Sequence, residues 1–458
     1  MPKGNRNYFF EPDCEHNGRQ EKRGCMRSKA GDSSMGGCAF EGSLSTLLAI
    51  EDAAHLVHGT MSCLDNNWEH AEAMREEAGT ARYGFSTGLS RLDLIEGGEA
   101  KLRSAIDYIA ERFKPPVIFV YDTCATVLAM EDLDTACRQA AERWGIPVVP
   151  IHSAGNMGSR NMGNRLAGEA LFHQVIGKSD LNAPLRAGSF HVNLIGNNLG
   201  EAEGKAIEDL LSKIGVRVLA SFGRDSRFAN IQNAHQAKVN MVLCNRSMIT
   251  LARRMKESYG IPYFEGSFYG SREIRFSLRQ IAFHFQNREL DLRIARFIRK
   301  KERALLKDLV DLVKKLKGKR VLLYTEGIES WAFISALQEL GLRLIAIGTN
   351  GSNQEDLSRI RERAGTDTHL IPDGDDSAIV KAFRVRKADL MIVSGSHTYL
   401  PIKEKLPFLE INTEKRAAYT GYEGVHKLGQ DVLSQLEHPI WEMLKWKAPW
   451  DGEPDDKE

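Results

Sequence analysis

Short, strongly apolar runs that alternate with longer amphipathic runs constrain the fold of this chain more than any other feature. The apolar runs span 116–124, 146–153, 191–196, 217–223, 239–244, 320–326, 343–349 and 389–396. Amphipathic segments such as 130–145 and 329–341 separate them. Apolar strands separated by helices are typical of parallel sheets that are covered by helices on both faces. The sequence therefore predicts an α/β fold.

The 458 residues exceed what one ordinary core holds, so we expect several domains. The strand–helix series divide into three Rossmann-like domains, at 36–185, 186–300 and 301–458. A turn-rich segment, 178–189, marks the first boundary, and a charged helical segment, 299–320, marks the second. Residues 1–35 are polar, which predicts an N-terminal arm that orders only against a partner.

Charge and cysteine content narrow the partners and the compartment. Lys plus Arg (62) nearly balances Asp plus Glu (61), so no overall field attracts nucleic acid or a membrane. We see neither a transmembrane run nor the apolar core of a signal peptide, and we expect a cytoplasmic protein. In that reducing compartment the seven cysteines are expected to bind metal or to be buried, rather than to form disulfides.

Unusual residues follow several predicted strands, where parallel sheets place their functional loops. They are Thr123-Cys124, the segment 155–165 (GNMGSRNMGNR), Cys244, and Thr325 to Gly327. Their positions predict one site between domains.

The cysteines taken alone leave two interpretations open. Cys38 and Cys63 flank the segment 37–63, which we interpret as one apolar helix, and Cys124 follows a strand. These three lack the CxxC spacing of a local metal site, so burial as small hydrophobes competes with metal ligation. Cys137, inside a helical pattern, is expected in the core. Cys14 and Cys25, with His16 in the arm, either bind a metal or have no role.

At these residues the sequence resembles the nitrogenase component 1 superfamily. The resemblance is carried in order along nearly the whole chain by GGCAFEGS (36–43), DAAHLVHGTMSC (52–63), VIFVYDTC (117–124), GNRLAGEA (163–170), KRVLLYTEGIESW (319–331) and LPFLEINTEKRAAYTGY (406–422). The pattern is most similar to the α-type scaffold subunit for nitrogenase cofactor assembly.

The resemblance implies an α-type subunit that pairs with a homologous β-type subunit in an α2β2 heterotetramer. Cys38, Cys63 and Cys124 match thiolates that, with cysteines of the partner, hold an interface iron–sulfur cluster, either P-cluster-like or 4Fe-4S. Cys244 matches the thiolate that anchors a larger iron–sulfur cofactor, of the nitrogenase type or its precursor. Thiolates suit iron–sulfur clusters, and distant loops can supply them. On this interpretation the helix between Cys38 and Cys63 is a rigid spacer between two ligands.

The sequence departs from the family pattern around the implied cofactor pocket. Ala71 stands where relatives keep an arginine, and Asn164 and Asn412 stand where dinitrogen-reducing subunits have histidines. The run after Cys124 is also altered, to CATVLAMEDLD. We therefore expect no dinitrogen reduction. The leading hypothesis is a catalytic subunit similar to methylthio-alkane reductases, which cleave C–S bonds of small thioethers. The alternatives are a cofactor-assembly scaffold and a nucleotide-binding α/β protein with structural cysteines.

The chain contains neither GxxxxGK[ST] nor GxGxxG. The resemblance therefore implies a separate ATP-hydrolysing iron protein as electron donor, with electrons passing through the interface cluster to the cofactor, where a small substrate is reduced. Candidate acid–base residues are His70, Glu265 and His397. The sequence does not rank them, and each is equally explained as an ordinary surface or hydrogen-bonded polar residue.

Overall fold

The structure is a computed structural model. It describes residues 8–9, 28–29, 37–65, 68, 83–178, 190–196, 201–224, 226–243, 245–326, 329–350, 354–372, 376–394, 397–411, 419–444 and 446. The chain divides into two compact units: unit 1 holds residues 1–267 and 275–298, and unit 2 holds residues 268–274 and 299–458. In the polar arm, β1 (Tyr8–Phe9) pairs antiparallel with β2 (Ser28–Lys29).

The first sheet of unit 1 is entirely parallel and carries the candidate site at its carboxyl edge. Its strands lie in the order β4-β3-β5-β6. Their bounds are β3 Ala54–Val57, β4 Tyr83–Ser86, β5 Ile118–Tyr121 and β6 Val148–Ile151. Every residue of β3, β5 and β6 is buried, which explains why their sequences read as continuous apolar runs.

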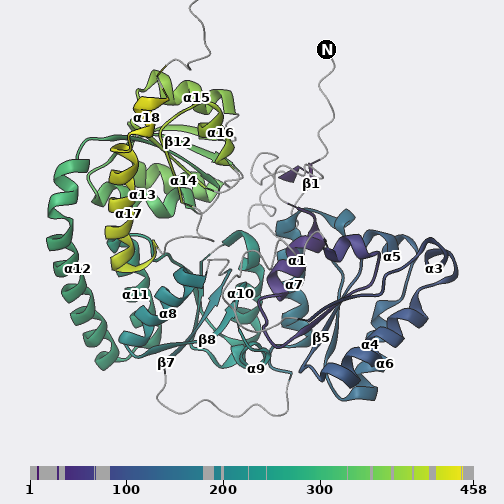
Figure 1. The fold of residues 1–458 in the computed structure, drawn as a ribbon. Coiled ribbons are helices and arrows are strands. Elements are labelled where there is room, and N and C mark those ends of the chain that lie inside the picture. The colour runs from purple at the N-terminus through teal and green to yellow at the C-terminus, as the bar shows by residue number, and fades with distance from the viewer. Residues whose placement is uncertain are drawn as a thin grey trace, which may run out of the picture. The chain divides into compact units, whose positions relative to one another are not determined.

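Helices cover both faces of this sheet (Figure 1). They are α1 Ala39–Leu47, α3 Arg91–Glu96, α4 Glu99–Phe113, α5 Cys124–Leu128, α6 Leu133–Trp144 and α7 Arg160–Gln174, with a 3-10 turn, η2, at Gly155–Met157. Alternate residues of β5 pack into different cores: Phe119 and Tyr121 join the cluster that includes Leu44 of α1. Ile118 and Val120 join the cluster that includes Leu102 of α4.

The second sheet of unit 1 repeats the strand order of the first. It runs β10-β9-β7-β8, with β7 Phe190–Ile195, β8 Val216–Phe222, β9 Val239–Val242 and β10 Tyr263–Glu265. Its helices are α8 Glu201–Lys213, α9 Phe228–Gln232, the 3-10 helix η3 Asn233–Gln236, α10 Asn245–Tyr259 and α11 Ser271–Phe285. In each sheet the first strand of the series lies between the second and the third. The order in which strands are added therefore reverses at the first strand, and such a switch point opens a crevice.

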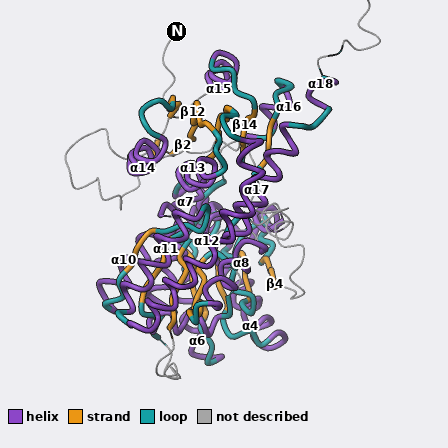
Figure 2. The backbone as a smooth tube through the Cα atoms, turned by 90° about the vertical axis from the view of Figure 1, so that its left-hand side faces the viewer, coloured by secondary structure: helices purple, strands orange, loops and turns teal. Residues whose placement is uncertain are grey.

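Unit 2 is built on one parallel sheet in the order β13-β12-β11-β14-β15. The strands are β11 Arg320–Glu326, β12 Arg343–Asn350, β13 His369–Pro372, β14 Leu390–Val393 and β15 Phe408–Glu410. The helices are α13 Glu329–Glu339, α14 Gln354–Ala364, α15 Asp376–Val385, α16 Tyr399–Lys403, α17 Gly421–Leu436 and α18 Ile440–Met443. Strands lie inside and helices outside, as the colours of Figure 2 show. The long helix α12, Arg288–Leu316, belongs to both units.

These parallel sheets flanked by helices confirm the predicted α/β fold class. All eight predicted strands are present, but β3, β4, β10, β13 and β15 were not predicted. Two of the three larger sheets lie in unit 1 and the third lies in unit 2, and the division into three domains stays a prediction. No helix in the described part of the chain is both long enough and apolar enough to cross a membrane.

The prediction of one helix across 37–63 is wrong. Helix α1 ends at Leu47, and the chain then enters β3 at Ala54. Strand β3 escaped prediction because a histidine interrupts its apolar run. His55 is fully buried there, and its Nδ1 lies 2.8 Å from the Tyr121 hydroxyl on the neighbouring strand. Cys38 and Cys63 are therefore separated by a helix and a central strand, and no helical spacer joins them.

Candidate iron–sulfur site

Cys38, Cys63 and Cys124 lie at the carboxyl edge of the first sheet. Cys38 is the N-cap of α1, Cys63 lies in the helical turn 61–65 that follows β3, and Cys124 begins α5 directly after β5. Because β3 and β5 are adjacent at the switch point of the sheet, the loops that follow them open at the same crevice.

Gly155, at the start of η2, lies between two of the sulfurs. A Cβ atom built on Gly155 would be 3.1 Å from both Cys38 Sγ and Cys124 Sγ, so the two sulfurs are no further apart than twice that distance. The third cysteine, Cys63, lies close enough for the charges of the other two to affect the pKa of its thiol. Burial raises the pKa of the Cys63 thiol, and the charges of Cys124 and Cys38 raise it further. The three cysteines are thus gathered at one place.

The donor set fits a cluster better than a single ion. Among the described residues, no group of three His, Cys, Asp or Glu side chains could hold one metal ion. In a 4Fe-4S cluster each thiolate binds a different iron, so the sulfurs are spread around the inorganic core. None of the three thiols forms a disulfide, and none is fully buried, whereas Cys137 is buried as predicted and burial raises its pKa to about 12.

Two backbone contacts hold Cys38 in place. The Ala39 N–H donates to the Gly158 carbonyl (3.0 Å), and the Arg160 N–H donates to the Gly37 carbonyl (3.2 Å). We predicted the segment 155–165 as a loop, but α7 begins at Arg160, so this part of the prediction is wrong. The last part of the segment 155–165 packs closely against α1, because Gly163 has no side chain. A Cβ on Gly163 would lie 1.8 Å from the Ala39 carbonyl oxygen.

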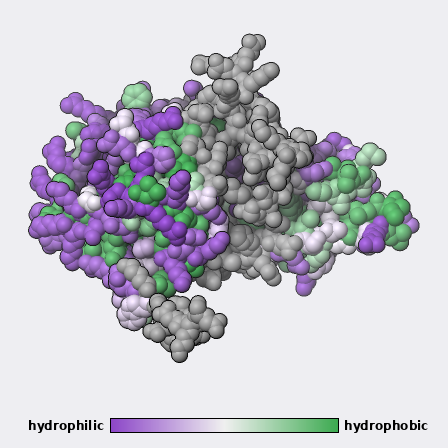
Figure 3. All heavy atoms as spheres, turned by 90° about the horizontal axis from the view of Figure 1, so that it is seen from above, coloured by the Kyte–Doolittle hydropathy of each residue, from purple (hydrophilic) through white to green (hydrophobic). Residues whose placement is uncertain are grey.

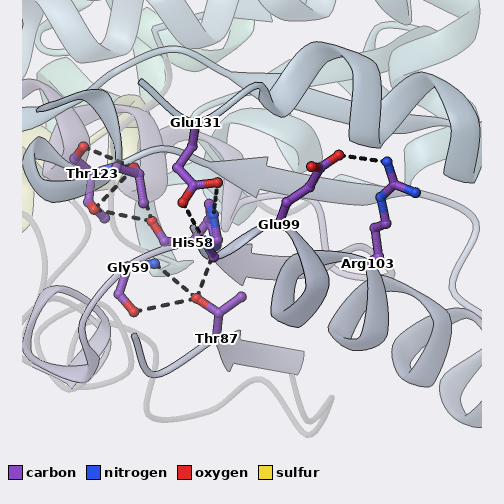
Figure 4. A network of polar contacts seen from close by, with 9 residues as sticks. His58, Gly59, Thr87, Glu99, Arg103, Thr123 and Glu131 are labelled. Atoms are coloured by element: carbon purple, nitrogen blue, oxygen red, sulfur yellow. Dashed lines mark hydrogen bonds and ion pairs between the residues drawn. The ribbon is translucent and has the colours of Figure 1, made fainter. Parts of the chain in front are cut away.

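The loops that carry Cys63 and Cys124 are joined through hydroxyl groups. The Thr123 hydroxyl donates to the His58 carbonyl (3.1 Å), and the Thr126 hydroxyl donates to the same oxygen (3.4 Å). Gly59 must lack a side chain, because its Cβ would lie 2.5 Å from two side-chain atoms of Thr123. The two cysteine loops therefore meet at His58 and Gly59, as Figure 4 shows.

Asp122 joins β5 to the loop that holds Gly155. Its Oδ1 accepts the Ser153 N–H (2.9 Å), and its Oδ2 lies 3.2 Å from His152 Nδ1. The other ring nitrogen of His152, Nε2, lies 3.1 Å from Asp134 Oδ1. These contacts place the carboxyl ends of β5 and β6 side by side.

His152 gives the metal-free protein a pH-dependent stability. Its contact with Asp122, and then that with Asp134, raises the His152 pKa from 6.5 to about 9. Because the folded-state pKa is the higher one, the stabilisation is complete below about pH 6.5 and is lost as pH rises through about 9. We expect the melting temperature of the wild type to exceed that of His152→Gln at pH 6, and the difference to vanish by about pH 10. A difference that stays constant over this range would contradict the assignment.

The remaining predicted residues are dispersed or lie outside the described part of the chain. Asn164 is buried and accepts the Thr46 hydroxyl (3.0 Å), which joins α7 to α1. Glu265 is half-buried at the end of β10 in unit 1, whereas His397 is buried in unit 2, stacked 4.0 Å from the Tyr324 ring. Cys14, Cys25, His70, Ala71, Cys244, Gly327 and Asn412 lie outside the described residues. By sequence position, Cys244 lies between the end of β9 and the start of α10.

Sequence reasoning missed His58 and Glu131, whereas Gly155 is the first residue of the predicted segment 155–165. His58 is fully buried, and its Nε2 lies 3.8 Å from Glu131 Oε2. Burial lowers the His58 pKa, and the carboxylates of Glu131 and Asp122 oppose this shift. The one available signal was a histidine and a glycine directly after a strand, where parallel sheets place functional loops.

Large apolar side chains are exposed around the thiols. Met61, Val127 and Leu128 flank Cys63 and Cys124 in sequence and are 55%, 40% and 78% exposed. Others on the same domain are Leu92, Ile95, Met130 and Met157. Apolar residues also gather at the right-hand end of the view in Figure 3. Exposed apolar side chains that gather on one surface are typical of sites that bind another protein.

Known proteins match the chain along most of its length. The model of the family described as nitrogenase component 1 type oxidoreductase matches residues 38–437. The nitrogenase iron-molybdenum cofactor biosynthesis protein NifE of Rippkaea orientalis is 38% identical over 445 residues, covering 96% of this chain and 94% of the relative. NifE of Klebsiella pneumoniae is 39% identical over 449 residues, covering 96% and 97%. The solved structure "Nitrogenase Cp1 at pH 5" has a TM-score of 0.78 at 25% identity, covering 93% of each chain. The chain therefore belongs to the nitrogenase component 1 family.

Proposed function

We propose that this chain is the α-type scaffold subunit of a complex that assembles the iron–molybdenum cofactor of nitrogenase. This function was the alternative in the sequence analysis, and relatives named for cofactor biosynthesis, 38% and 39% identical over nearly the whole chain, favour it over the reductase hypothesis. The structural observation that carries the proposal is the meeting of Cys38, Cys63 and Cys124 beside Gly155.

In this proposal the three thiolates hold one side of an interface iron–sulfur cluster, which supplies low-potential electron transfer when bound. The thiols of this chain must lose their protons on binding, so cluster binding is expected to weaken as pH falls. Gly155 leaves the space between Cys38 and Cys124 open, because a side chain there would occupy it. Cys244 is proposed to anchor the larger cofactor or its precursor.

A homologous β-type subunit is the proposed partner, in an α2β2 heterotetramer. The support is the exposed apolar surface around Cys63 and Cys124, of which Leu128 is 78% exposed. Covering this surface would remove the apolar side chains from water and would exclude solvent from the cluster. The partner would also supply the remaining cluster ligands, since three thiolates leave part of a cluster unligated.

Sequence departures around the implied pocket favour a second candidate function, cleavage of C–S bonds in methylthio-alkanes. Ala71 replaces an arginine, which removes a fixed positive charge from the neighbourhood of an anionic ligand. In this case an ATP-hydrolysing iron protein would deliver the electrons. His70, Glu265 and His397 would remain the candidate proton donors.

One pair of assays separates the two functions. The complex is purified with its β-type partner under anaerobic conditions, and its cluster is offered to apo-nitrogenase. A scaffold should restore nitrogenase activity, and Cys244→Ala should abolish this transfer while the iron of the interface cluster remains. The same complex is then incubated with iron protein, ATP, reductant and a thioether. Release of methanethiol without any transfer would reject the scaffold and establish the reductase.

A further inference from the structure

A buried acid and a buried histidine lie directly behind two of the cysteine loops. His58 follows β3 and is fully buried, and the side chain of Glu131, which follows α5, is 7% exposed. Glu131 Oε2 lies 3.8 Å from His58 Nε2. Figure 4 shows both side chains pointing toward each other from different segments of the first domain. Buried charged groups persist where other contacts compensate for the loss of water.

Glu131 is held by the N-terminus of α4. The N-cap of that helix is Gly98, which has no side chain to accept a hydrogen bond from the first turn. The Gly98 N–H instead donates to Glu131 Oε1. In a capping box the residue three positions into the helix supplies this acceptor, but here that residue is Lys101. A carboxylate from a distant segment therefore takes the place of the missing cap, and its orientation is fixed.

His58 is held from the opposite side and in turn holds both cysteine loops. Its Nδ1 lies 3.1 Å from the Thr87 hydroxyl, which also accepts the Gly59 N–H (3.1 Å). Its carbonyl oxygen accepts hydrogen bonds from the hydroxyls of Thr123 (3.1 Å) and Thr126 (3.4 Å). These residues lie one position before and two positions after Cys124. The turn that leads to Cys63 and the turn that begins with Cys124 therefore share one anchor.

Cys38 depends on other contacts. Its neighbours Gly37 and Ala39 bond to Arg160 and Gly158, and Gly155 is placed through Ser153 and Asp122. Among the described residues, no hydrogen bond or ion pair joins His58 or Glu131 to these residues. The arrangement thus has two independent parts, one for Cys63 with Cys124 and one for Cys38 with Cys124.

We propose that His58 and Glu131 are positioning residues that set the separation of Cys63 and Cys124. The consequence for a cluster rests on the proposed function, but the separation itself is a property of the metal-free chain. Loss of Glu131 frees the imidazole and the N-terminus of α4 together, so the Cys63 turn gains alternative positions. Cys124 keeps its place because it follows β5 closely and because the Thr123 N–H donates to the Thr126 hydroxyl (2.9 Å), so the separation of Cys38 and Cys124 is unaffected.

The test measures thiol pairs in the metal-free, full-length protein. Dibromobimane becomes fluorescent when it bridges two nearby sulfurs, and peptide mass mapping identifies which cysteines it has joined. In Glu131→Ala we expect the Cys63–Cys124 product to fall about fivefold, the factor that loss of one ordinary hydrogen bond produces between two arrangements. The Cys38–Cys124 product should stay at the wild-type yield.

Three further variants make the result specific. Thr87→Val removes the contact on the other side of His58 and should give the same selective loss. Glu131→Gln keeps an oxygen that accepts the Gly98 N–H and should restore most of the Cys63–Cys124 yield. Glu99→Gln breaks only the exposed Glu99–Arg103 pair on α4 (2.6 Å) and should change neither product.

An unchanged Cys63–Cys124 yield in Glu131→Ala would overturn the proposal. Equal loss of both products in Glu131→Ala and in Thr87→Val would also overturn it, because the domain would then be loosened as a whole. After cluster loading, a changed EPR spectrum in Glu131→Ala, restored in Glu131→Gln, extends the positioning role to the cluster. A wild-type protein that binds no iron would reject the proposed function and would leave the thiol result intact.

Discussion

Replacing Cys124 by alanine is expected to remove the interface cluster from the purified complex. The thiol of Cys124 lies beside Gly155 and close to Cys38 and Cys63, so its loss takes one ligand from the middle of the set. Losing a thiolate ligand removes one of the iron–thiolate bonds that hold the cluster. Iron bound at this cluster should fall by roughly tenfold or more.

The control for this substitution is Cys137→Ala in the same domain. Cys137 is 1% exposed in the core between α4, α6 and the sheet, far from any role as a ligand. The substitution Cys137→Ala should cost about 1 kcal/mol of stability through lost packing and should leave the iron content unchanged. The iron content and the visible absorption of the complex are measured for both variants. Full iron content in Cys124→Ala would show that this thiol is no ligand.

Replacing Gly163 by alanine is expected to destabilise unit 1 strongly. The new Cβ would lie 1.8 Å from the Ala39 carbonyl oxygen and 2.8 Å from the Ser43 nitrogen, both backbone atoms of α1. Backbone atoms cannot rotate away, so α1 and α7 must separate. Overpacking of this kind costs about 3 kcal/mol, which lowers the melting temperature by roughly 6–12 °C.

A matched control lies on the same helix. At Gly168 a new Cβ would meet Met248 Cε at 3.2 Å, the flexible end of a side chain. Gly168→Ala should therefore be tolerated, with the gain in helix propensity offsetting the small adjustment. Because Cys38 is the N-cap of α1, Gly163→Ala should also lower the yield of the Cys38–Cys124 cross-linked product in the metal-free protein. Equal melting temperatures for the two variants would contradict the close packing of α1 on α7.

Much of the fold was predictable because burial leaves a local trace in the sequence. Strand β5 reads as an apolar run since Phe119 and Ile118 face different cores and both are buried. Strand β3 was missed because its histidine disguises the same burial. The buried His55 has a polar partner in Tyr121, which belongs to a strand more than sixty positions further along the chain.

The sequence predicted the cysteines of the candidate site through family resemblance, and the segment 155–165 through its position after a strand. The spacing of the cysteines carried no geometric information, and the helical spacer inferred from it was wrong. Glu131 and the position of Gly155 between two sulfurs gave no signal, because a glycine in a loop and an acid after a short helix are ordinary features of a sequence. Their roles exist only once β6 lies beside β5 and α4 begins beside His58.

The sequence by itself determined the α/β class, most of the strands and the identity of the sulfur donors. The physical reason is that hydrophobic burial and side-chain chemistry are properties of single residues and their near neighbours. Only the tertiary structure decided which thiols meet, which glycine leaves the space between them and which buried pair anchors their loops. Strand order and the crossing of α1 on α7 bring those residues together across long stretches of chain, and no local pattern records such contacts.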